Sequence, residues 1–231
     1  MHLSGLIKSS LIDYPGKVAA VVFTQGCNFR CGFCHNPDLI PIKPGLISEE
    51  EIFKHLEKRK DILDGVVITG GEPLIQRDIV SFIRKIKDMG LLVKIDTNGS
   101  NPKILDTLLS QGLVDYIAMD IKGPLKNYSN ISGYLNNKFI QESIDLLLGS
   151  KTEYEFRTTV LPYYHSLNDF EDIGKLIKGA NKYVVQGFRP DITYNQNLRN
   201  ELSFSLSEME QICQIMKKHV KNVVLYNNLS T

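Results

Sequence analysis

The sequence predicts an α/β fold: a partial (βα)₆ barrel built on a parallel sheet with right-handed crossovers. Apolar runs typical of strands alternate with helical periodicities about six times along the 231 residues. The composition, 42% hydrophobic and 23% charged, is that of an ordinary globular protein. Unusual polar residues follow the ends of six strands, whereas an open doubly wound sheet gathers its ligand contacts at one switch point. The distribution of polar residues therefore favours the partial barrel.

The strands are expected at short apolar runs. In chain order they cover residues 17–23, 65–69, 91–95, 115–121, 154–161, 182–188 and 222–226. Ser48 and Glu51 form a capping box that begins a helix ending near Ile62, and Pro102 begins another helix. Apolar residues three and four positions apart mark the other helices: Ile75, Ile79, Phe82, Ile83 and Ile86; Phe139, Ile140, Ile144, Leu147 and Leu148; Phe170, Ile173, Leu176 and Ile177; Leu206, Met209, Ile212, Cys213 and Met216.

One domain is expected over residues 1–231, with an N-terminal extension (1–16), a partial barrel (17–190) and a C-terminal helix and strand (191–231). The formal net charge of +1 provides no general basic field, so nucleic acid is not expected as a partner. No apolar run approaches the roughly 18 residues of a membrane span. Residues 1–16 lack a signal-peptide pattern, and unpaired cysteines fit a reducing compartment, which together predict a cytoplasmic protein.

Three of the four cysteines, Cys27, Cys31 and Cys34, stand directly after the first expected strand. Three thiolates this close cannot all pair as disulfides. They can instead hold three irons of a [4Fe-4S] cluster and leave the fourth iron without a protein ligand. An open metal site indicates catalysis, so these cysteines are the candidate catalytic and metal-binding residues.

Other interpretations of these cysteines compete with the cluster. Cys31 to His35 spells C-x-x-C-H, the pattern of covalent haem attachment, but that chemistry belongs to exported proteins. A structural zinc bound by the three cysteines and His35 is a legitimate tetrahedral set, although adjacent Cys34 and His35 would be strained in facing one metal. Cys213 lies in a helical apolar stripe, where a cysteine is usually a small core residue, and we assign it no ligand role.

These motifs resemble those of the radical S-adenosylmethionine superfamily over essentially the whole chain. Its C-x₃-C-x₂-C loop is matched by Cys27, Cys31 and Cys34, its usual aromatic residue by Phe33, and the chain also carries Gly70-Gly71-Glu72-Pro73. The resemblance implies that the open iron binds the amino and carboxylate groups of S-adenosylmethionine. It also implies that the reduced cluster cleaves this cofactor to methionine and a 5′-deoxyadenosyl radical.

The Gly70-Gly71-Glu72-Pro73 turn is a candidate cofactor site. Gly70 and Gly71 lack side chains, so the backbone can approach a ligand closely, and Glu72 can accept a hydrogen bond from an ammonium group. This resembles the family's binding site for the methionine amino group. The alternative is a simple Gly-Gly turn with a solvated glutamate.

A second group of candidates lies at the ends of the next two strands. Carboxylates flanked by Ile95, Ile117 and Ile121 need partners, and Lys122 could neutralise one of them. Resemblance to the glycyl-radical-enzyme activases implies cofactor contacts and a monovalent cation here. The implied cofactor contacts are Asp96, Asn98, Asp120 and Lys122, and the implied cation ligands are Asp96, Thr97, Met119 and Asp120. The alternative is a structural Asp-Lys pair.

The last candidates belong to the fifth and sixth strands. Arg157 could contact a carboxylate through its bidentate fork. The resembling activases often carry Leu-Pro-Tyr-His after the sixth strand, with a histidine that touches the cofactor. Here Leu161-Pro162-Tyr163-Tyr164-His165 follows the fifth strand instead. His165 is therefore expected to be an ordinary loop residue, and Gln186 or Arg189 to take over its role.

Residues 11–17, Leu-Ile-Asp-Tyr-Pro-Gly-Lys, resemble the corresponding element of anaerobic ribonucleoside-triphosphate reductase activating proteins. The chain has no additional cysteines for the auxiliary clusters of some related activases, so a single cluster is expected. The resemblance implies an electron from flavodoxin or ferredoxin and removal of a Cα hydrogen from a glycine of that reductase. One alternative is a radical enzyme acting on a small molecule, such as those that make deazaguanine precursors. A non-catalytic zinc-binding module is the other.

Overall fold

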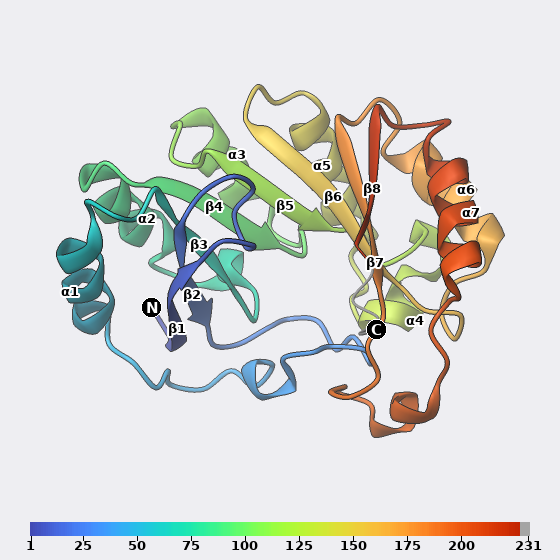
Figure 1. Ribbon diagram of the computed structural model, residues 1–231, viewed down its shortest axis with the longest axis horizontal. Helices are drawn as coiled ribbons and strands as arrows, with labels where there is room; N and C mark the ends of the chain where they lie inside the picture. Colours follow the sequence, from blue (N-terminus) through green and yellow to red (C-terminus); the bar gives the residue numbers. More distant parts are fainter. Residues whose placement is uncertain (227–231) are drawn as a thin grey trace. The chain divides into compact units, whose positions relative to one another are not determined.

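The computed structural model describes residues 1–226, in which eight strands form a sheet whose order follows the chain from β1 to β8 (Figure 1). The strands are β1 (Leu3–Ser10), β2 (Ala19–Thr24), β3 (Gly65–Gly70), β4 (Leu92–Thr97), β5 (Tyr116–Asp120), β6 (Glu153–Val160), β7 (Lys182–Gly187) and β8 (Asn222–Tyr226). β2, β3 and β4 pair in parallel, as do β6, β7 and β8. The predicted α/β fold is confirmed, and the sheet is open, as a partial barrel requires.

Seven α-helices connect the strands of residues 1–226. They are α1 (Glu49–Arg59), α2 (Ile79–Asp88), α3 (Pro102–Ser110), α4 (Tyr128–Ser132), α5 (Asn137–Leu148), α6 (Leu167–Leu176) and α7 (Leu206–Met216). Short 3₁₀ turns occur at η1 (Pro37–Leu39), η2 (Pro73–Ile75), η3 (Leu125–Asn127) and η4 (Gln196–Asn200). The capping box of Ser48 and Glu51 is confirmed at the start of α1. None of the helices in the described residues is long and apolar enough to cross a membrane.

The sequence did not predict β1 or α4, and it placed Ile75 in the wrong element. β1, which was assigned to an N-terminal extension, pairs antiparallel with β2. Its glycine and serines conceal the strand pattern, and the structure forms it through backbone pairing with a neighbour that local sequence does not reveal. Ile75, expected in the second helix, lies in η2, because Glu72 caps a short turn that ends before α2 begins at Ile79.

The chain divides into two compact units. The first comprises residues 1–28, 38–118 and 150–153, and the second begins with residues 29–37 and includes residues 119–149 and the chain from Tyr154 onward. The expected single domain and its subdivision stay predictions, and residues 227–231 of its C-terminal part lie outside the described residues.

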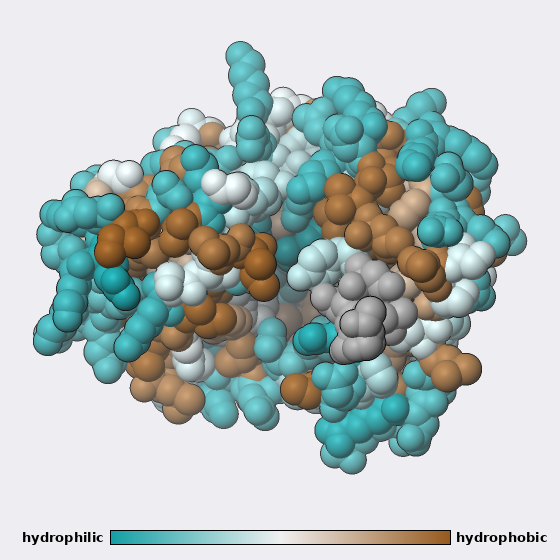
Figure 2. Space-filling view, in the orientation of Figure 1, coloured by the Kyte–Doolittle hydropathy of each residue, from teal (hydrophilic) through white to brown (hydrophobic). Residues whose placement is uncertain are grey.

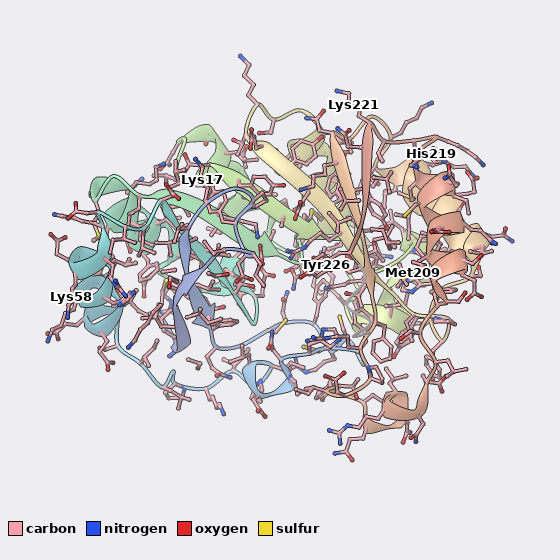
Figure 3. All side chains as sticks on the ribbon, in the orientation of Figure 1. Lys17, Lys58, Met209, His219, Lys221 and Tyr226 are labelled. Atoms are coloured by element: carbon pink, nitrogen blue, oxygen red, sulfur yellow. The ribbon has the colours of Figure 1, made fainter. Side chains whose placement is uncertain are left out.

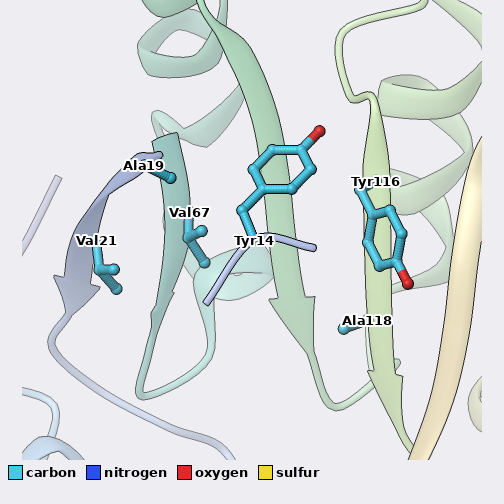
Figure 4. Packing of buried hydrophobic residues seen from close by; sticks show 6 residues of the cluster. All are labelled: Tyr14, Ala19, Val21, Val67, Tyr116 and Ala118. Atoms are coloured by element: carbon cyan, nitrogen blue, oxygen red, sulfur yellow. The ribbon is translucent and has the colours of Figure 1, made fainter. Parts of the chain in front are cut away.

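In the first unit, side chains from three strands, β2, β3 and β5, and from the segment before β2 form a small buried cluster (Figure 4). The cluster consists of Tyr14, Ala19, Val21, Val67, Tyr116 and Ala118. The rings of Tyr14 and Tyr116 lie 6.0 Å apart and are tilted by 56°. Alanine side chains leave room for these rings, so the segment before β2 is held by packing. On the outside of this unit, α1 buries Ile52 and Leu56 and presents a hydrophilic surface (Figure 2).

In the second unit, α6 and α7 lie beside β7 and β8 (Figure 1). α7 buries an apolar stripe that includes Met209, Ile212 and Cys213, as its periodicity predicts. His219, just after α7, places Nε2 2.9 Å from Oε2 of Glu171 on α6 (Figure 3). Apolar packing and this polar contact therefore join the two helices.

Replacing Tyr14 by alanine is expected to reduce the free energy of unfolding by about 3 to 5 kcal/mol, because the ring is 4% exposed and its loss leaves a cavity. Tyr14→Phe keeps the ring and should cost much less. Urea denaturation measures both. Tyr194→Ala is the control, since that ring is 47% exposed. Equal stability of Tyr14→Ala and wild type would show that the cluster contributes nothing.

Candidate active site

Cys27 belongs to the first unit and is held at the end of β2 by backbone hydrogen bonds. Its N–H donates to the carbonyl of Ile40 at 3.0 Å, and the preceding Gly26 N–H donates to Leu39 at 2.8 Å. The side-chain nitrogen of Asn98, Nδ2, lies 3.9 Å from Cys27 Sγ. The sulfur of Cys27 therefore faces an amide donor that follows the end of β4.

Cys31 and Cys34 belong to the second unit, where a backbone bond of 3.1 Å from Cys34 N to Cys31 O closes a turn between them. The segment is fixed by Arg30 N donating to Ser132 O at 2.7 Å and by Asn195 N donating to Gly32 O at 2.8 Å. None of the four cysteines, all of which are described, forms a disulfide. The thiols remain available as ligands.

Burial raises the pKa of Cys31 to about 11, against the opposing effect of the nearby Lys122 ammonium. Burial also raises the pKa of Cys34. Thiolates are the metal-binding form, and a bound cation replaces the thiol protons. Burial therefore favours the protonated form of both thiols until a bound cationic centre replaces their protons.

Within residues 1–226, no group of three or more His, Cys, Asp or Glu side chains is arranged to hold a metal ion in advance. The donor chemistry fits an iron-sulfur cluster, because the loop supplies three thiols and the fourth cysteine lies in the α7 stripe. The backbone bonds within each unit hold the individual cysteines.

The Gly70-Gly71 pair allows two segments of the first unit to approach closely. Gly70 has φ of 111°, and a Cβ there would lie 2.5 Å from Thr24 N. A Cβ on Gly71 would collide with the carbonyl of Gly26. The Cβ positions of both glycines are thus filled by the chain's own backbone near Cys27. Their role in cofactor binding stays a prediction.

Glu72 is 1% exposed and its carboxylate binds the end of β4. Oε1 accepts hydrogen bonds from Leu74 N at 3.0 Å and Thr97 Oγ1 at 2.7 Å, and Oε2 accepts from Asn98 N at 2.7 Å. The alternative of a solvated glutamate is therefore wrong. The role of Glu72 as an acceptor for a ligand ammonium stays a prediction.

Asp96 pairs with Lys94, whose side chain is only 3% exposed. The ammonium of Lys94 also lies 6.0 Å from the ring centroid of Tyr116. Sequence reasoning named Lys122 as the neutralising cation and overlooked Lys94. The sequence could have indicated the Lys94–Asp96 pair, because residues two apart on a strand point to the same face.

In the second unit, Asp120 accepts from Lys122 Nζ at 3.0 Å and from Arg157 Nε at 2.8 Å. Burial alone would raise the pKa of Asp120, but the charges of Arg157 and Lys122 lower it to about 2. Against the effect of burial, Asp120 and the neighbouring Cys31 raise the pKa of Lys122. The Lys122 ammonium also lies 5.8 Å from the ring centroid of Phe33. The predicted Asp-Lys pair is present, with Arg157 as a third member.

His165 has a structural contact that the sequence did not indicate. It is 3% exposed, and its Nε2 lies 2.9 Å from the carbonyl oxygen of Lys122. Leu161 N donates to Nδ1 at 3.2 Å, so the tautomer with a proton on Nε2 donates to Lys122. His165 is therefore a buried loop residue whose ring holds the backbone that carries the Lys122 ammonium.

The remaining candidate residues differ in how far they are buried. Met119 and Thr97 are buried, Gln186 is half-buried in β7 and Arg189 is exposed. Burial, followed by the charge of Arg189, lowers the pKa of His35. The Nε2 atom of His35 has no hydrogen-bond partner within residues 1–226. Their roles in cofactor binding stay predictions.

The family description "Radical SAM superfamily" matches residues 21–177. The chain belongs to this superfamily. It is 34% identical to MJ1227 of Methanocaldococcus jannaschii over 96% of this chain and 95% of that protein, which is provisionally named a glycyl-radical enzyme activating enzyme. It is 36% identical to the pyruvate formate-lyase-activating enzyme of Clostridium pasteurianum over 48% of each chain. Within the radical SAM proteins, the chain groups with the glycyl-radical enzyme activating enzymes.

Solved structures support the fold of this radical SAM protein. Streptococcus suis SuiB bound to precursor peptide SuiA superposes with a TM-score of 0.68 at 14% identity, covering 88% of this chain and 48% of that chain. The chain thus spans about half the length of SuiB. A domain of the pyruvate-formate lyase-activating enzyme from Bacteroides vulgatus gives 0.55 at 13% identity, over 70% of this chain and 98% of that domain.

Asp120→Asn is expected to lower the free energy of unfolding by roughly 2 kcal/mol at neutral pH, because the depressed pKa of this carboxylate reflects favourable charge pairing. The contribution is full above the unfolded-state pKa of about 3.9 and is lost as the pH falls toward the folded-state pKa of about 2. The stability difference should therefore shrink on acidification. Urea denaturation from pH 7 to pH 3 measures it.

Asp106→Asn is the matched control for this series, because Asp106 is an exposed aspartate of the first unit. It should change the stability by less than about 0.5 kcal/mol. A stability difference for Asp120→Asn that stays constant with pH would contradict the charge pairing.

Proposed function

We propose that this radical SAM protein installs a glycyl radical on a partner enzyme, and that the partner is an anaerobic ribonucleoside-triphosphate reductase. The observation that carries the activating role is the C-x₃-C-x₂-C loop in a chain that aligns with MJ1227 over 96% of its length. The choice of reductase is supported by the resemblance of residues 11–17 to the corresponding element of the activating proteins of that reductase.

Cys27, Cys31 and Cys34 would hold a [4Fe-4S] cluster with one iron open to S-adenosylmethionine. When bound, the cluster supplies one electron to the cofactor. Glu72 would accept from the methionine ammonium group, beside the Gly70-Gly71 backbone. Lys122 and Arg157 would contact carboxylate or ribose oxygens of S-adenosylmethionine. Asp120 would hold the Lys122 ammonium and the Arg157 guanidinium in place.

The remaining candidate contacts of the cofactor are grouped by unit. In the first unit they are Pro73, Asp96 and Asn98, and in the second unit they are Phe33, Gln186 and Arg189. Partly buried ion pairs already occupy the carboxylates of Asp96 and Asp120. A monovalent cation bound by Asp96, Thr97, Met119 and Asp120 would compete with the ammonium groups of Lys94 and Lys122 for these carboxylates.

The proposed reaction consumes one electron, which flavodoxin or ferredoxin supplies. That electron breaks the sulfur to C5′ bond of S-adenosylmethionine, which leaves methionine and the 5′-deoxyadenosyl radical. The radical takes one hydrogen atom from a glycine Cα of the partner, giving 5′-deoxyadenosine and the glycyl radical. A reducing compartment such as the cytoplasm would keep the three cysteines available for this chemistry.

The cluster is tested by Cys31→Ala. We expect this variant to lose the reduced-cluster signal in electron paramagnetic resonance and to lose cleavage of S-adenosylmethionine, because one iron loses its thiolate. Cys213→Ala is the matched control, since Cys213 lies in the apolar stripe of α7, and it should keep both properties. Survival of cluster and cleavage in Cys31→Ala would contradict the assignment, and zinc in the wild-type protein would favour the closed tetrahedral site.

The partner is tested by mixing the reduced protein and S-adenosylmethionine with purified anaerobic ribonucleoside-triphosphate reductase or with pyruvate formate-lyase. We expect a glycyl radical signal only on the reductase, with one 5′-deoxyadenosine formed for each radical. A variant of the reductase whose radical glycine is alanine should give no signal. A radical on pyruvate formate-lyase alone would contradict the proposed partner and keep the activating role.

A further inference from the structure

We propose that the side-chain amide of Asn98 donates a hydrogen bond to the sulfur of Cys27 and thereby raises the reduction potential of the cluster that Cys27 binds. The inference rests on the cluster in the proposed function. It assigns Asn98 a tuning role that acts through Cys27, distinct from the predicted contact with S-adenosylmethionine. All the residues involved lie in the first unit.

The orientation of the Asn98 amide is fixed by its neighbours. Its oxygen, Oδ1, accepts from the backbone N–H of Ser100 at 2.9 Å, so the amide nitrogen must lie on the opposite branch. One hydrogen of that nitrogen points to Asn28 Oδ1 at 3.0 Å. The amide has two hydrogens, and Nδ2 lies 3.9 Å from Cys27 Sγ, which leaves the second hydrogen for the sulfur.

The partner amide is fixed in the same way. Asn28 Nδ2 donates to Ser100 Oγ at 2.8 Å, so Asn28 Oδ1 is the atom that faces Asn98. A flip of either amide would place two donors or two acceptors against each other. Ser100 therefore sets both orientations, through its backbone N–H for Asn98 and through its hydroxyl for Asn28.

The donor is also held in place from its backbone. Glu72 Oε2 accepts from Asn98 N at 2.7 Å, and Gly99 N donates to Thr97 Oγ1 at 3.1 Å. Asn98 is 6% exposed, so little water competes for its amide. A donor held this way needs no reorganisation when the charge on the sulfur changes.

The electrostatic consequence has a definite sign. Reduction adds negative charge to the cluster and its thiolates, and an N–H dipole directed at a thiolate stabilises the reduced form more than the oxidised form. The hydrogen bond from Asn98 therefore raises the reduction potential. Loss of the donor should make the cluster harder to reduce without removing any iron ligand.

The experiment is a potentiometric titration of the reconstituted protein, followed by electron paramagnetic resonance. In Asn98→Ala, the ratio of reduced to oxidised cluster at a fixed potential should fall roughly three- to tenfold, since one hydrogen bond to a charged group is lost. A tenfold change corresponds to about 59 mV for a one-electron couple. Asn98→Asp keeps the acceptor for Ser100 N and replaces the donor by a negative charge, so its ratio should fall further.

Asn101→Ala is the matched control. Asn101 is a half-buried asparagine of the first unit, but its amide donates to Leu74 O at 2.8 Å and its oxygen caps α3. This variant should lose some stability and keep the wild-type potential. A general structural disturbance would instead shift the potential in both alanine variants, which would overturn the inference.

A measurement on the wild-type protein does not depend on how the variants fold. With ¹⁵N placed only in asparagine side chains, pulsed electron paramagnetic resonance should detect a nitrogen coupled to the reduced cluster, and the signal should be absent from unlabelled protein. A cluster with no such coupling, or an unchanged potential in Asn98→Ala, overturns the inference and leaves the proposed function standing. Absence of any cluster overturns both.

Discussion

The buried carboxylate of Glu72 is the interaction on which the first unit's part of the site depends. It accepts three hydrogen bonds, from Leu74 N, Thr97 Oγ1 and Asn98 N, and so joins the turn after β3 to the end of β4. A buried carboxylate with unsatisfied oxygens would be costly, which fixes both segments to it. The glycines before it let this turn pack against the backbone next to Cys27, and Asn98 then faces the sulfur.

In the second unit, ion pairs around Asp120 hold the candidate site residues in the same way. Asp120 gathers Lys122 and Arg157, and His165 holds the backbone of Lys122 from a loop forty-three positions further along the chain. Removing any one of these groups would leave a charge or a carbonyl without its partner. The ammonium of Lys122 is therefore a fixed positive charge near Cys31, and it opposes the effect of burial on that thiol.

Much of the fold could be predicted because the strands that bury both faces carry their own apolar signal. β8 and the start of α3 fall where the sequence predicts them. β1 was missed, since its pattern is weak and its pairing with β2 supplies the structure. The contacts of Lys94 and His165 were missed as well, because each depends on a partner that only the folded chain provides.

The sequence by itself determined the α/β class, the three-cysteine loop and the membership of the radical SAM superfamily. These depend on local periodicity and on short motifs whose chemistry is set by residue type and spacing. The tertiary structure decided which group faces which: Lys94 with Asp96, His165 with the Lys122 carbonyl, and the Asn98 amide with Cys27. Hydrogen bonds and ion pairs act over a few ångströms, so their partners are known only when distant segments have been brought together.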